Sequence, residues 1–251
     1  MTQTVTVTGM VLSSAPIGEF DRRIVLLTKE KGKISAFAKG ARRPTSHLLG
    51  IVNPFSFGEF TLYEGRSSYN LMQGKITNYF TELRENVEAA YYGFYFMEFA
   101  GYYAKEYTDE TESLKLLYQS LRALLNSHLS NELVRYIFEL KLIAVHGEGP
   151  QVFSCLGCGK KEGPFVFCSR RGGILCGNCK NQEPDAIHLD NSTLYTLQYI
   201  VASPIGKLYT FTVSDEVLRR LRKILKRYKD VYVEQKFKSL EMLELVSGVK
   251  D

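Results

Sequence analysis

The chain has 251 residues, of which 45% are hydrophobic and 24% are charged, and its net charge is +5. This length has room for two compact domains and a small insert, and the hydrophobic share is ordinary for a globular protein. No apolar stretch is long enough to cross a bilayer, and residues 1–8 lack the basic and apolar regions of a signal peptide. We therefore expect a cytoplasmic protein that is not associated with membranes.

The charge is unevenly distributed along the chain. Residues 1–80 hold 10 Lys and Arg against 5 Asp and Glu, and residues 151–181 hold 5 against 1. Residues 81–150 have the opposite balance, with 6 basic against 11 acidic side chains. This asymmetry predicts a protein that binds a polyanion through its basic segments and uses the acidic segment as a scaffold.

The first 80 residues have the pattern of a β-domain. Val5, Val7 and Val11 alternate with threonines, which is the period of a half-buried strand. Further strands are expected at 23–28, 33–38, 52–63 and 70–76, with residues 29–32 as a hairpin turn. Five short strands with a polar loop between the third and the fourth predict a small closed barrel, and we expect an OB-fold over residues 1–80.

From residue 81 onward the apolar residues recur at intervals of three and four. Helices are predicted at 82–107, 113–126, 131–146, 192–202 and 215–228. The first is rich in Tyr and Phe, which could form a base-stacking platform, but aromatics at helical spacing in an acidic segment more often form core. The fold class is therefore α+β: an OB barrel, then a helical domain over 81–251 with an insert at about 151–182.

Four cysteines in this insert have the spacing of a metal site. Cys155 and Cys158 form one CxxC pair, Cys176 and Cys179 form a second pair, and 17 residues separate the two pairs. Two such turns can close a tetrahedron of thiolates around one ion, so we expect one structural zinc per chain. Disulfides are the alternative, which a chain without secretory features disfavours. Cys168 lies in an apolar run and is expected to be a buried thiol, not a ligand.

A basic loop follows the third predicted strand. Lys39, Gly40, Arg42 and Arg43 place three cations around a glycine, and a guanidinium donates two hydrogen bonds to one phosphate. Beside an OB barrel this loop is where a nucleic-acid strand would run. Weaker candidates for phosphate contacts are Arg22, Arg23 and Lys33. The alternative for this loop is a solvated charged turn.

The helix expected at residues 215–228 has an apolar stripe and a strongly basic remainder. The basic side chains are Arg219, Arg220, Arg222, Lys223, Lys226 and Arg227. They could receive an acidic partner peptide or extend a nucleic-acid track. The alternative is an ordinary surface helix with a solvated face, and the sequence does not separate these possibilities.

No constellation of catalytic residues emerges from the sequence. There is no phosphate-binding GxxxxGK[ST] loop, and the four histidines are scattered, with none paired to a nucleophile. We therefore expect a protein that is not an enzyme.

Several runs of the chain resemble the RecO family of bacterial recombination mediators. The N-terminal runs are Gly18–Asp21, Leu26–Thr28, Gly32–Ile34, Ala38–Arg43 and Pro54–Phe55, and the order of barrel, helices and four-cysteine knuckle agrees. The resemblance covers most of the chain. Some members of the family lack the cysteines, so the metal supports architecture in this family and need not be essential to activity.

The resemblance implies binding to single- and double-stranded DNA, annealing of complementary strands and association with the nucleoid. The implied partners are RecR and the single-stranded DNA-binding protein, and RecA indirectly, which would be loaded onto strands covered by that binder. Two other classes remain open. One is a zinc module that reads nucleic acid or binds other partners through Lys160, Lys161, Arg170 and Arg171; the other is an OB protein that binds RNA.

Overall fold

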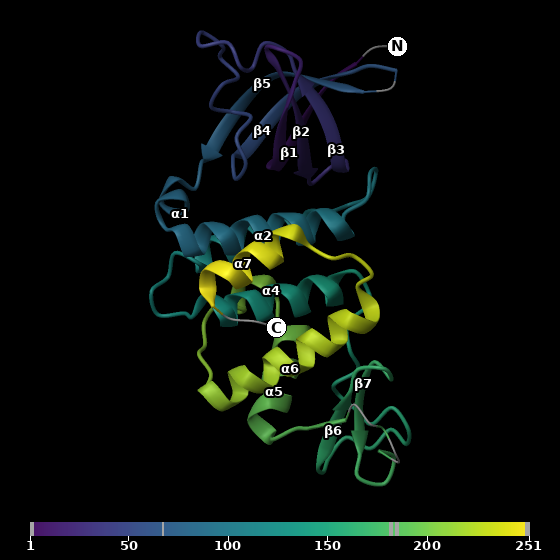
Figure 1. Ribbon diagram of the computed structural model, residues 1–251. Helices are drawn as coiled ribbons and strands as arrows, with labels where there is room; N and C mark the ends of the chain where they lie inside the picture. Colours follow the sequence, from purple (N-terminus) through teal and green to yellow (C-terminus); the bar gives the residue numbers. More distant parts are fainter. Residues whose placement is uncertain (1–2, 67, 181–182, 184–185, 249–251) are drawn as a thin grey trace. The chain divides into compact units, whose positions relative to one another are not determined.

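The computed structural model describes residues 3–66, 68–180, 183 and 186–248. It is a mixed α+β chain with strands first and helices after them, as predicted (Figure 1). The chain divides into two compact units, Met1–Leu121 and Arg122–Asp251. Within the described part, no helix combines the length and the apolar character that spanning a membrane requires.

The first unit begins with five strands that form a closed barrel (Figure 1). The strands are β1 (Gln3–Ile17), β2 (Asp21–Thr28), β3 (Gly32–Ala38), β4 (Phe57–Glu64) and β5 (Tyr69–Asn78). Their order around the barrel is β1-β2-β3-β5-β4, and β1 pairs back with β4. A five-stranded barrel closed in this order is an OB-fold, so the predicted fold is confirmed.

The closure between β3 and β5 is the parallel pairing in the barrel, and it is short. It joins Ala36 to Tyr69 and Phe37 to Asn70. The other strand pairs are antiparallel and run over most of the length of their strands.

Alternation along β3 shows why these residues form a half-buried strand. Ile34, Ala36 and Ala38 are buried in the core of the barrel, whereas Ser35 and Phe37 point outward and are half-buried. The outer face of β3 is therefore partly open to solvent at its carboxyl end.

Several predicted element boundaries were wrong, two of them in the first unit by a break or a shift of several residues. The strand expected from residue 52 begins at Phe57, because the chain turns at Phe55, which has a φ of 71°. The helix expected over 82–107 is interrupted at Asn86, whose extended backbone separates α1 (Thr81–Glu85) from α2 (Val87–Tyr103). The side chain of Asn86 accepts from the N–H of Ala89 and so caps α2.

The aromatic residues of α2 are mostly core. Tyr95, Phe96 and Phe99 are buried, and the helical spacing predicted this for Tyr95 and Phe99. Phe94 is the most exposed aromatic residue of the helix, at 43%, and its ring lies 4.9 Å from that of Phe55. The helix therefore serves chiefly to support the first unit.

The remaining helices begin with α3 (Thr111–Ala123), most of which belongs to the first unit. The second unit contains α4 (Asn131–Val145), α5 (Asn191–Ala202), a short 3-10 turn (Ile205–Lys207), α6 (Asp215–Tyr232) and α7 (Lys238–Ser247). The structure extends α6 beyond the predicted end at residue 228, and α7 was not predicted. Leu221, Ile224 and Leu225 of the apolar stripe of α6 are buried. The stripe is therefore used for packing within this unit.

A small three-stranded sheet carries the cysteine segment of the second unit. Its order is β7 (Gly173–Cys176), β6 (Phe165–Cys168) and β8 (Ile187–His188). All residues of β6 and β7 are buried, which fixes the turns on either side of them.

Candidate nucleic-acid interface and metal centre

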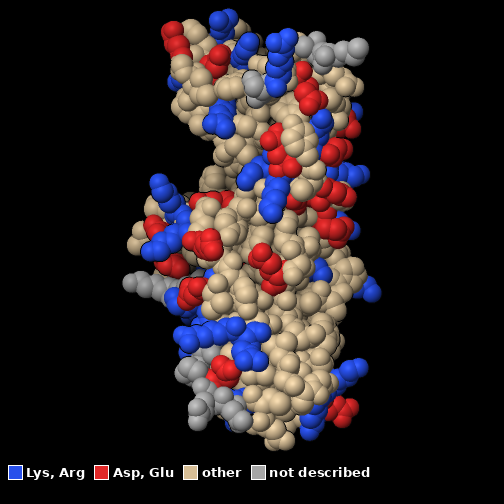
Figure 2. Space-filling model, turned by 90° about the vertical axis from the view of Figure 1, so that its right-hand side faces the viewer, with Lys and Arg blue, Asp and Glu red and all other residues tan. Residues whose placement is uncertain are grey.

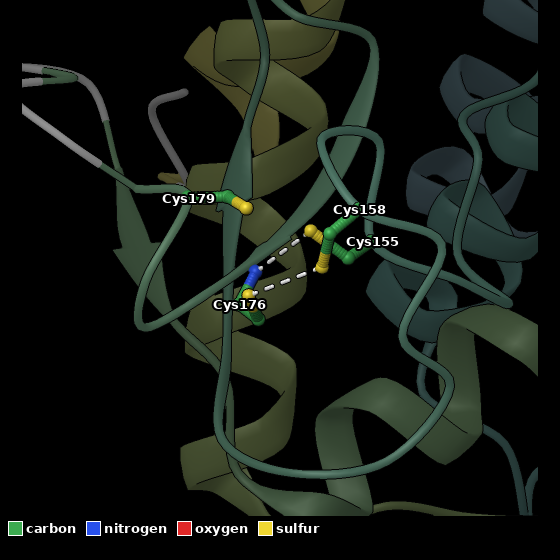
Figure 3. A group of neighbouring side chains, drawn as sticks. All are labelled: Cys155, Cys158, Cys176 and Cys179. Atoms are coloured by element: carbon green, nitrogen blue, oxygen red, sulfur yellow. Dashed lines mark hydrogen bonds between the residues drawn. The ribbon is translucent and has the colours of Figure 1, made fainter.

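The four cysteines of the two CxxC pairs converge on one point. The Sγ atoms of Cys155, Cys158, Cys176 and Cys179 all lie within 4.8 Å of one another, with Cys176 at the end of β7 and the others in turns (Figure 3). All four are free thiols, and the Sγ atoms of Cys158 and Cys176 are 3.7 Å apart. The disulfide alternative is therefore not adopted in this structure.

The electrostatics of the cluster favour a cation. Burial tends to raise the pKa of Cys155, but backbone N–H groups, led by that of Cys176, lower it to about 6. The neighbouring thiols raise the pKa of Cys179 to about 12. Thiolates packed this closely repel one another, so all four can ionise together only if a positive ion offsets their charge.

The residues present fit a tetrahedral thiolate site. Zinc–sulfur bonds of about 2.3 Å place the sulfurs of a regular tetrahedron roughly 3.8 Å apart, close to the observed Cys158–Cys176 separation. Gly157 leaves room for this arrangement, because a Cβ atom there would lie 2.9 Å from the Sγ of Cys179. Cys168 is fully buried and lies outside the cluster, with its Sγ 3.6 Å from the Glu183 carboxylate.

The predicted basic loop after β3 is tied to the turn between β1 and β2. The N–H of Arg42 donates to the carbonyl of Phe20 at 2.9 Å, and its guanidinium donates to the carbonyl of Gly18 at 3.1 Å. The N–H of Gly40 donates to the carboxylate of Asp21 at 2.7 Å. These bonds hold two loops at one end of the barrel as a single basic surface, which we call the loop cluster: Gly18–Asp21 with Lys39–Arg43.

Three cations of the loop cluster are exposed. Lys39, Arg42 and Arg43 have no ion-pair partner among the residues that the structure describes. Arg43 lies over the ring of Phe20, 5.0 Å from its centroid. Phe20 was not predicted as a member of this surface, although an aromatic residue between Glu and Asp in a turn after glycine was a usable signal.

The three weaker candidates lie in different surroundings. Lys33 donates to the carbonyl of Gly101 in α2, so it holds the barrel to the helix and does not join the loop cluster. Arg22 is half-buried and donates to the hydroxyl of Ser14. Arg23 is exposed and donates through Nε to the hydroxyl of Ser35 at 2.8 Å.

Among the predicted basic residues of α6, Arg220 and Arg222 are engaged in ion pairs. Arg220 pairs with Asp190 and Glu216. Arg222 donates through Nε to Glu132 at 2.7 Å. The exposed members of the set are Arg219, Lys223, Lys226 and Arg227.

A buried charge network joins α6 to α4. The carboxylate of Glu139 accepts from Arg135 at 2.9 Å and from Lys229 at 2.7 Å. All three side chains are at most 9% exposed. Tyr136, in the same turn, hydrogen-bonds to Glu132, and its pKa is raised first by burial and then by that bond. Charged residues thus form part of the core of this unit.

Basic residues do not form one continuous band on the face drawn in Figure 2. Lys and Arg side chains are mixed there with Asp and Glu side chains over much of the surface. Whether a given cation can contact an anionic ligand therefore depends on its own neighbouring side chains.

Comparison with known proteins covers both parts of the chain. The family model described as recombination protein O, N terminal, matches residues 1–80, and the model described as recombination protein O, C terminal, matches residues 84–241.

Curated relatives agree with the family models over nearly the full length. The chain is 31% identical to DNA repair protein RecO of Acetivibrio thermocellus, over 96% of this chain and 97% of that protein. It is 32% identical to the protein of the same name from Alkaliphilus metalliredigens, over 95% and 98%. The RecO protein of Bacillus subtilis is 26% identical over 96% and 94%. With an OB barrel, a cluster of four cysteines and these matches, the chain belongs to the RecO family of DNA repair proteins.

Proposed function

We propose that this chain is a recombination mediator that binds single- and double-stranded DNA and anneals complementary strands. With RecR it would help to load RecA onto strands coated by the single-stranded DNA-binding protein. The observation that carries the proposal is the loop cluster, whose cations Lys39, Arg42 and Arg43 stand exposed on loops fixed to an OB barrel. Family membership supports the same role, and such a protein would act at the nucleoid.

Annealing requires no bond to be broken. It requires that phosphates on two strands be neutralised while the bases remain free to pair. Exposed guanidinium and ammonium groups without carboxylate partners supply the neutralisation, because they release counterions from the DNA on binding. We therefore propose a binding role without catalysis.

We also propose that one structural zinc ion is held by Cys155, Cys158, Cys176 and Cys179. When bound, it would offset the charge of the four thiolates and link the two CxxC turns. The Cys176→Ser variant should lose the metal and melt at a lower temperature, whereas Cys168→Ser should keep its metal content. Less than about half an equivalent of zinc in freshly purified protein would count against this site.

The exposed basic residues of α6 are proposed as the site of an acidic partner segment, the tail of the single-stranded DNA-binding protein. Arg219, Lys223 and Lys226 follow at intervals of four and three on one face of the helix. Arg220 and Arg222 are already paired with carboxylates, so Arg219→Glu with Lys223→Glu is the cleaner test. Loss of tail-peptide affinity with unchanged DNA affinity supports this site, and the reverse result assigns the helix to DNA.

The boundary between a DNA-binding barrel of residues 1–80 and the rest also stays a prediction. Lys33 bonds to Gly101, and the N–H of Lys33 bonds to the carbonyl of Lys105, so the isolated barrel would be without these two bonds to the helical segment.

A strand-annealing assay tests the main proposal. Two complementary labelled oligonucleotides are mixed with the wild-type protein, with a Lys39, Arg42, Arg43→Ala variant, and with a Lys160, Lys161→Ala variant of the cysteine segment. We expect the first variant to lose annealing and the second to keep it. The opposite result favours the alternative, a zinc module that itself contacts nucleic acid through exposed Lys160 and Lys161.

Two additional measurements complete the test. Matched DNA and RNA strands separate a DNA mediator from an RNA-binding OB protein. Pull-downs with RecR and with the single-stranded DNA-binding protein, with and without DNA, test the partners. Absence of both annealing and partner binding in the wild type would refute the proposal.

A further inference from the structure

A cavity of about 490 Å³ lies on the outside of the barrel, within the first unit. One wall is the outer face of β2 and β3, with Arg23 and Phe37. A second is formed by Arg66, which follows β4, and by Tyr69, the first residue of β5. The third is the loop between α2 and α3, which contributes Tyr107. The volume is in the range of small-ligand sites, and strands 2 and 3 with the β4–β5 loop are where OB-folds hold oligonucleotides.

Tyr107 is held in a strained conformation while its ring is presented to solvent. Its φ is 61°, in the left-handed region that non-glycine residues avoid, and the residue is 70% exposed. Its N–H donates to the carbonyl of Lys31 at 3.0 Å, and the preceding residue, Glu106, forms a bridge with Gly32. Backbone bonds on the β2–β3 turn thus fix the loop, and strain that is fixed in this way is typical of functional positions.

The floor of the cavity is held together by hydrogen bonds. The hydroxyl of Tyr69, which is only 4% exposed, donates to one oxygen of Glu64 at 3.0 Å, and Lys31 donates to the other at 3.0 Å. These two donors, Lys31 first, lower the pKa of Glu64. The carboxylate therefore stays ionised, and its charge is offset by Lys31.

The mixture of groups fits a nucleobase better than a phosphate. Phe37 and Tyr107 offer rings for stacking, while Glu106 adds negative charge that a phosphate would avoid. Carboxylates accept hydrogen bonds from the exocyclic amino groups of bases. Arg23 and Arg66 also line the cavity and could contact the phosphates on either side of the base. Arg66 is exposed and has no ion-pair partner in the described ranges.

The cavity is also close along the chain to the loop cluster. Arg23 pairs across the strands with Phe37, and Lys39 follows Phe37 by two residues. A DNA strand whose phosphates contact Lys39 would therefore lie near Phe37, which lines this cavity.

We propose that this cavity receives one unpaired base of a single strand, stacked on Tyr107, and so distinguishes single-stranded from duplex DNA. This proposal rests on the proposed DNA-binding function and adds that the cavity binds a base, whereas the loop cluster binds phosphates. A base in a duplex is paired and stacked, and it could enter only by being flipped out at a cost in free energy.

The Tyr107→Gly variant tests this assignment, because glycine removes the ring and accepts the left-handed backbone without strain. Affinities for a 20-base single strand and for the matching blunt duplex are measured at one salt concentration. Removal of the stacking ring should weaken single-strand binding roughly 5- to 100-fold and change duplex binding less than about twofold. Tyr107→Phe, which keeps a ring for stacking, should retain the single-strand affinity of the wild type.

Tyr195→Ala is the matched control, since Tyr195 is 66% exposed and lies on α5, outside the lining of this cavity. It should change neither affinity. If Tyr107→Gly did not fold, Tyr107→Asn would replace it, because Asn also tolerates the left-handed region. Equal weakening of single-strand and duplex binding, or no weakening of either, would overturn the proposal.

A strand with a run of abasic residues gives a second measurement. The wild type should bind it more weakly than the normal strand, whereas Tyr107→Gly should bind both strands alike. If the variant discriminates as strongly as the wild type, Tyr107 does not hold the base. The proposed function fails separately, namely if the wild type binds no DNA or if the Lys39, Arg42, Arg43→Ala variant binds as well as the wild type.

Discussion

The helix α6 and the loop cluster are both rich in cations, but they use them differently. In α6, Arg220, Arg222 and Lys229 bind carboxylates of the same unit, and the last of these lies in a buried network. In the loop cluster, Lys39 and Arg43 have no carboxylate partner among the described residues. The number of basic residues in a segment therefore overstates how many of its cations are available to a polyanion, because part of the α6 set is already paired with carboxylates.

The difference has an energetic side. An unpaired charge in the core costs free energy, so a buried cation needs a carboxylate partner. Glu139 is that partner for Arg135 and Lys229. An exposed cation on a loop is hydrated and contributes little to folding, so it is free to contact a ligand. Removing charge should thus affect stability in one region and affinity in the other.

The largest effect is expected for Glu139→Gln. This change leaves Arg135 and Lys229 buried without their carboxylate and should lower the free energy of unfolding of the second unit by about 3–5 kcal/mol. Denaturant unfolding followed by circular dichroism measures it. Glu216→Gln on α6, an exposed partner of Arg220, is the control and should cost less than about 1 kcal/mol. If the two variants lost the same free energy of unfolding, the buried network would contribute no more to stability than an exposed ion pair.

Replacement of Lys39, Arg42 and Arg43 by Ala should act on affinity. Each phosphate that is no longer neutralised reduces the salt slope by roughly 0.7 for single strands and 0.9 for duplex. Removing three such cations should therefore weaken binding about 100-fold or more at 0.1 M salt. Binding titrations over a salt series provide the slope.

The matched control for that variant replaces Arg219, Lys223 and Lys226 of α6 by Ala, again removing three exposed cations. If both triple variants change the slope equally, the DNA path includes α6 and the contrast between the two regions disappears. Melting temperature should change little in either variant, since surface substitutions are usually small in effect.

A smaller effect is expected for Arg222→Ala. The side chains of Arg222 and Glu132 are 32% and 13% exposed, so their ion pair is partly in contact with solvent. We therefore expect the free energy of unfolding to fall by about 1 kcal/mol. The salt slope of DNA binding should be unchanged. A reduced slope would instead mean that Arg222 leaves Glu132 to contact DNA.

The smallest effect is expected for Phe20→Ala. The ring of Phe20 orients the guanidinium of Arg43, and an exposed cation–π contact contributes about 0.5–1 kcal/mol. DNA affinity should fall roughly two- to fivefold without a change in the salt slope, because no cation is removed. A tighter complex would indicate that the ring competes with phosphate for Arg43.

Local patterns explain why the barrel and the cysteine cluster could be predicted. The alternation around Ile34 and the spacing of the CxxC pairs are properties of short segments. The pairing of Arg222 with Glu132 joins residues 90 positions apart, and no local pattern contains that information. The break at Asn86 was missed because the apolar period continues across it, although Asn is a good N-cap. Tyr107 was assigned to a helix, and its place in a cavity wall depends on tertiary contacts with the β2–β3 turn.

The short parallel closure of the barrel has a consequence for its motions. Two residue pairs join β3 to β5, so this edge should open locally at a lower free energy than the antiparallel edges. Amide hydrogens at Phe37 and Asn70 should therefore exchange with solvent earlier than those of β1 and β2. Phe37 and Tyr69 also line the cavity. A DNA strand bound there would contact both β3 and β5, and it should therefore slow the exchange of these amide hydrogens.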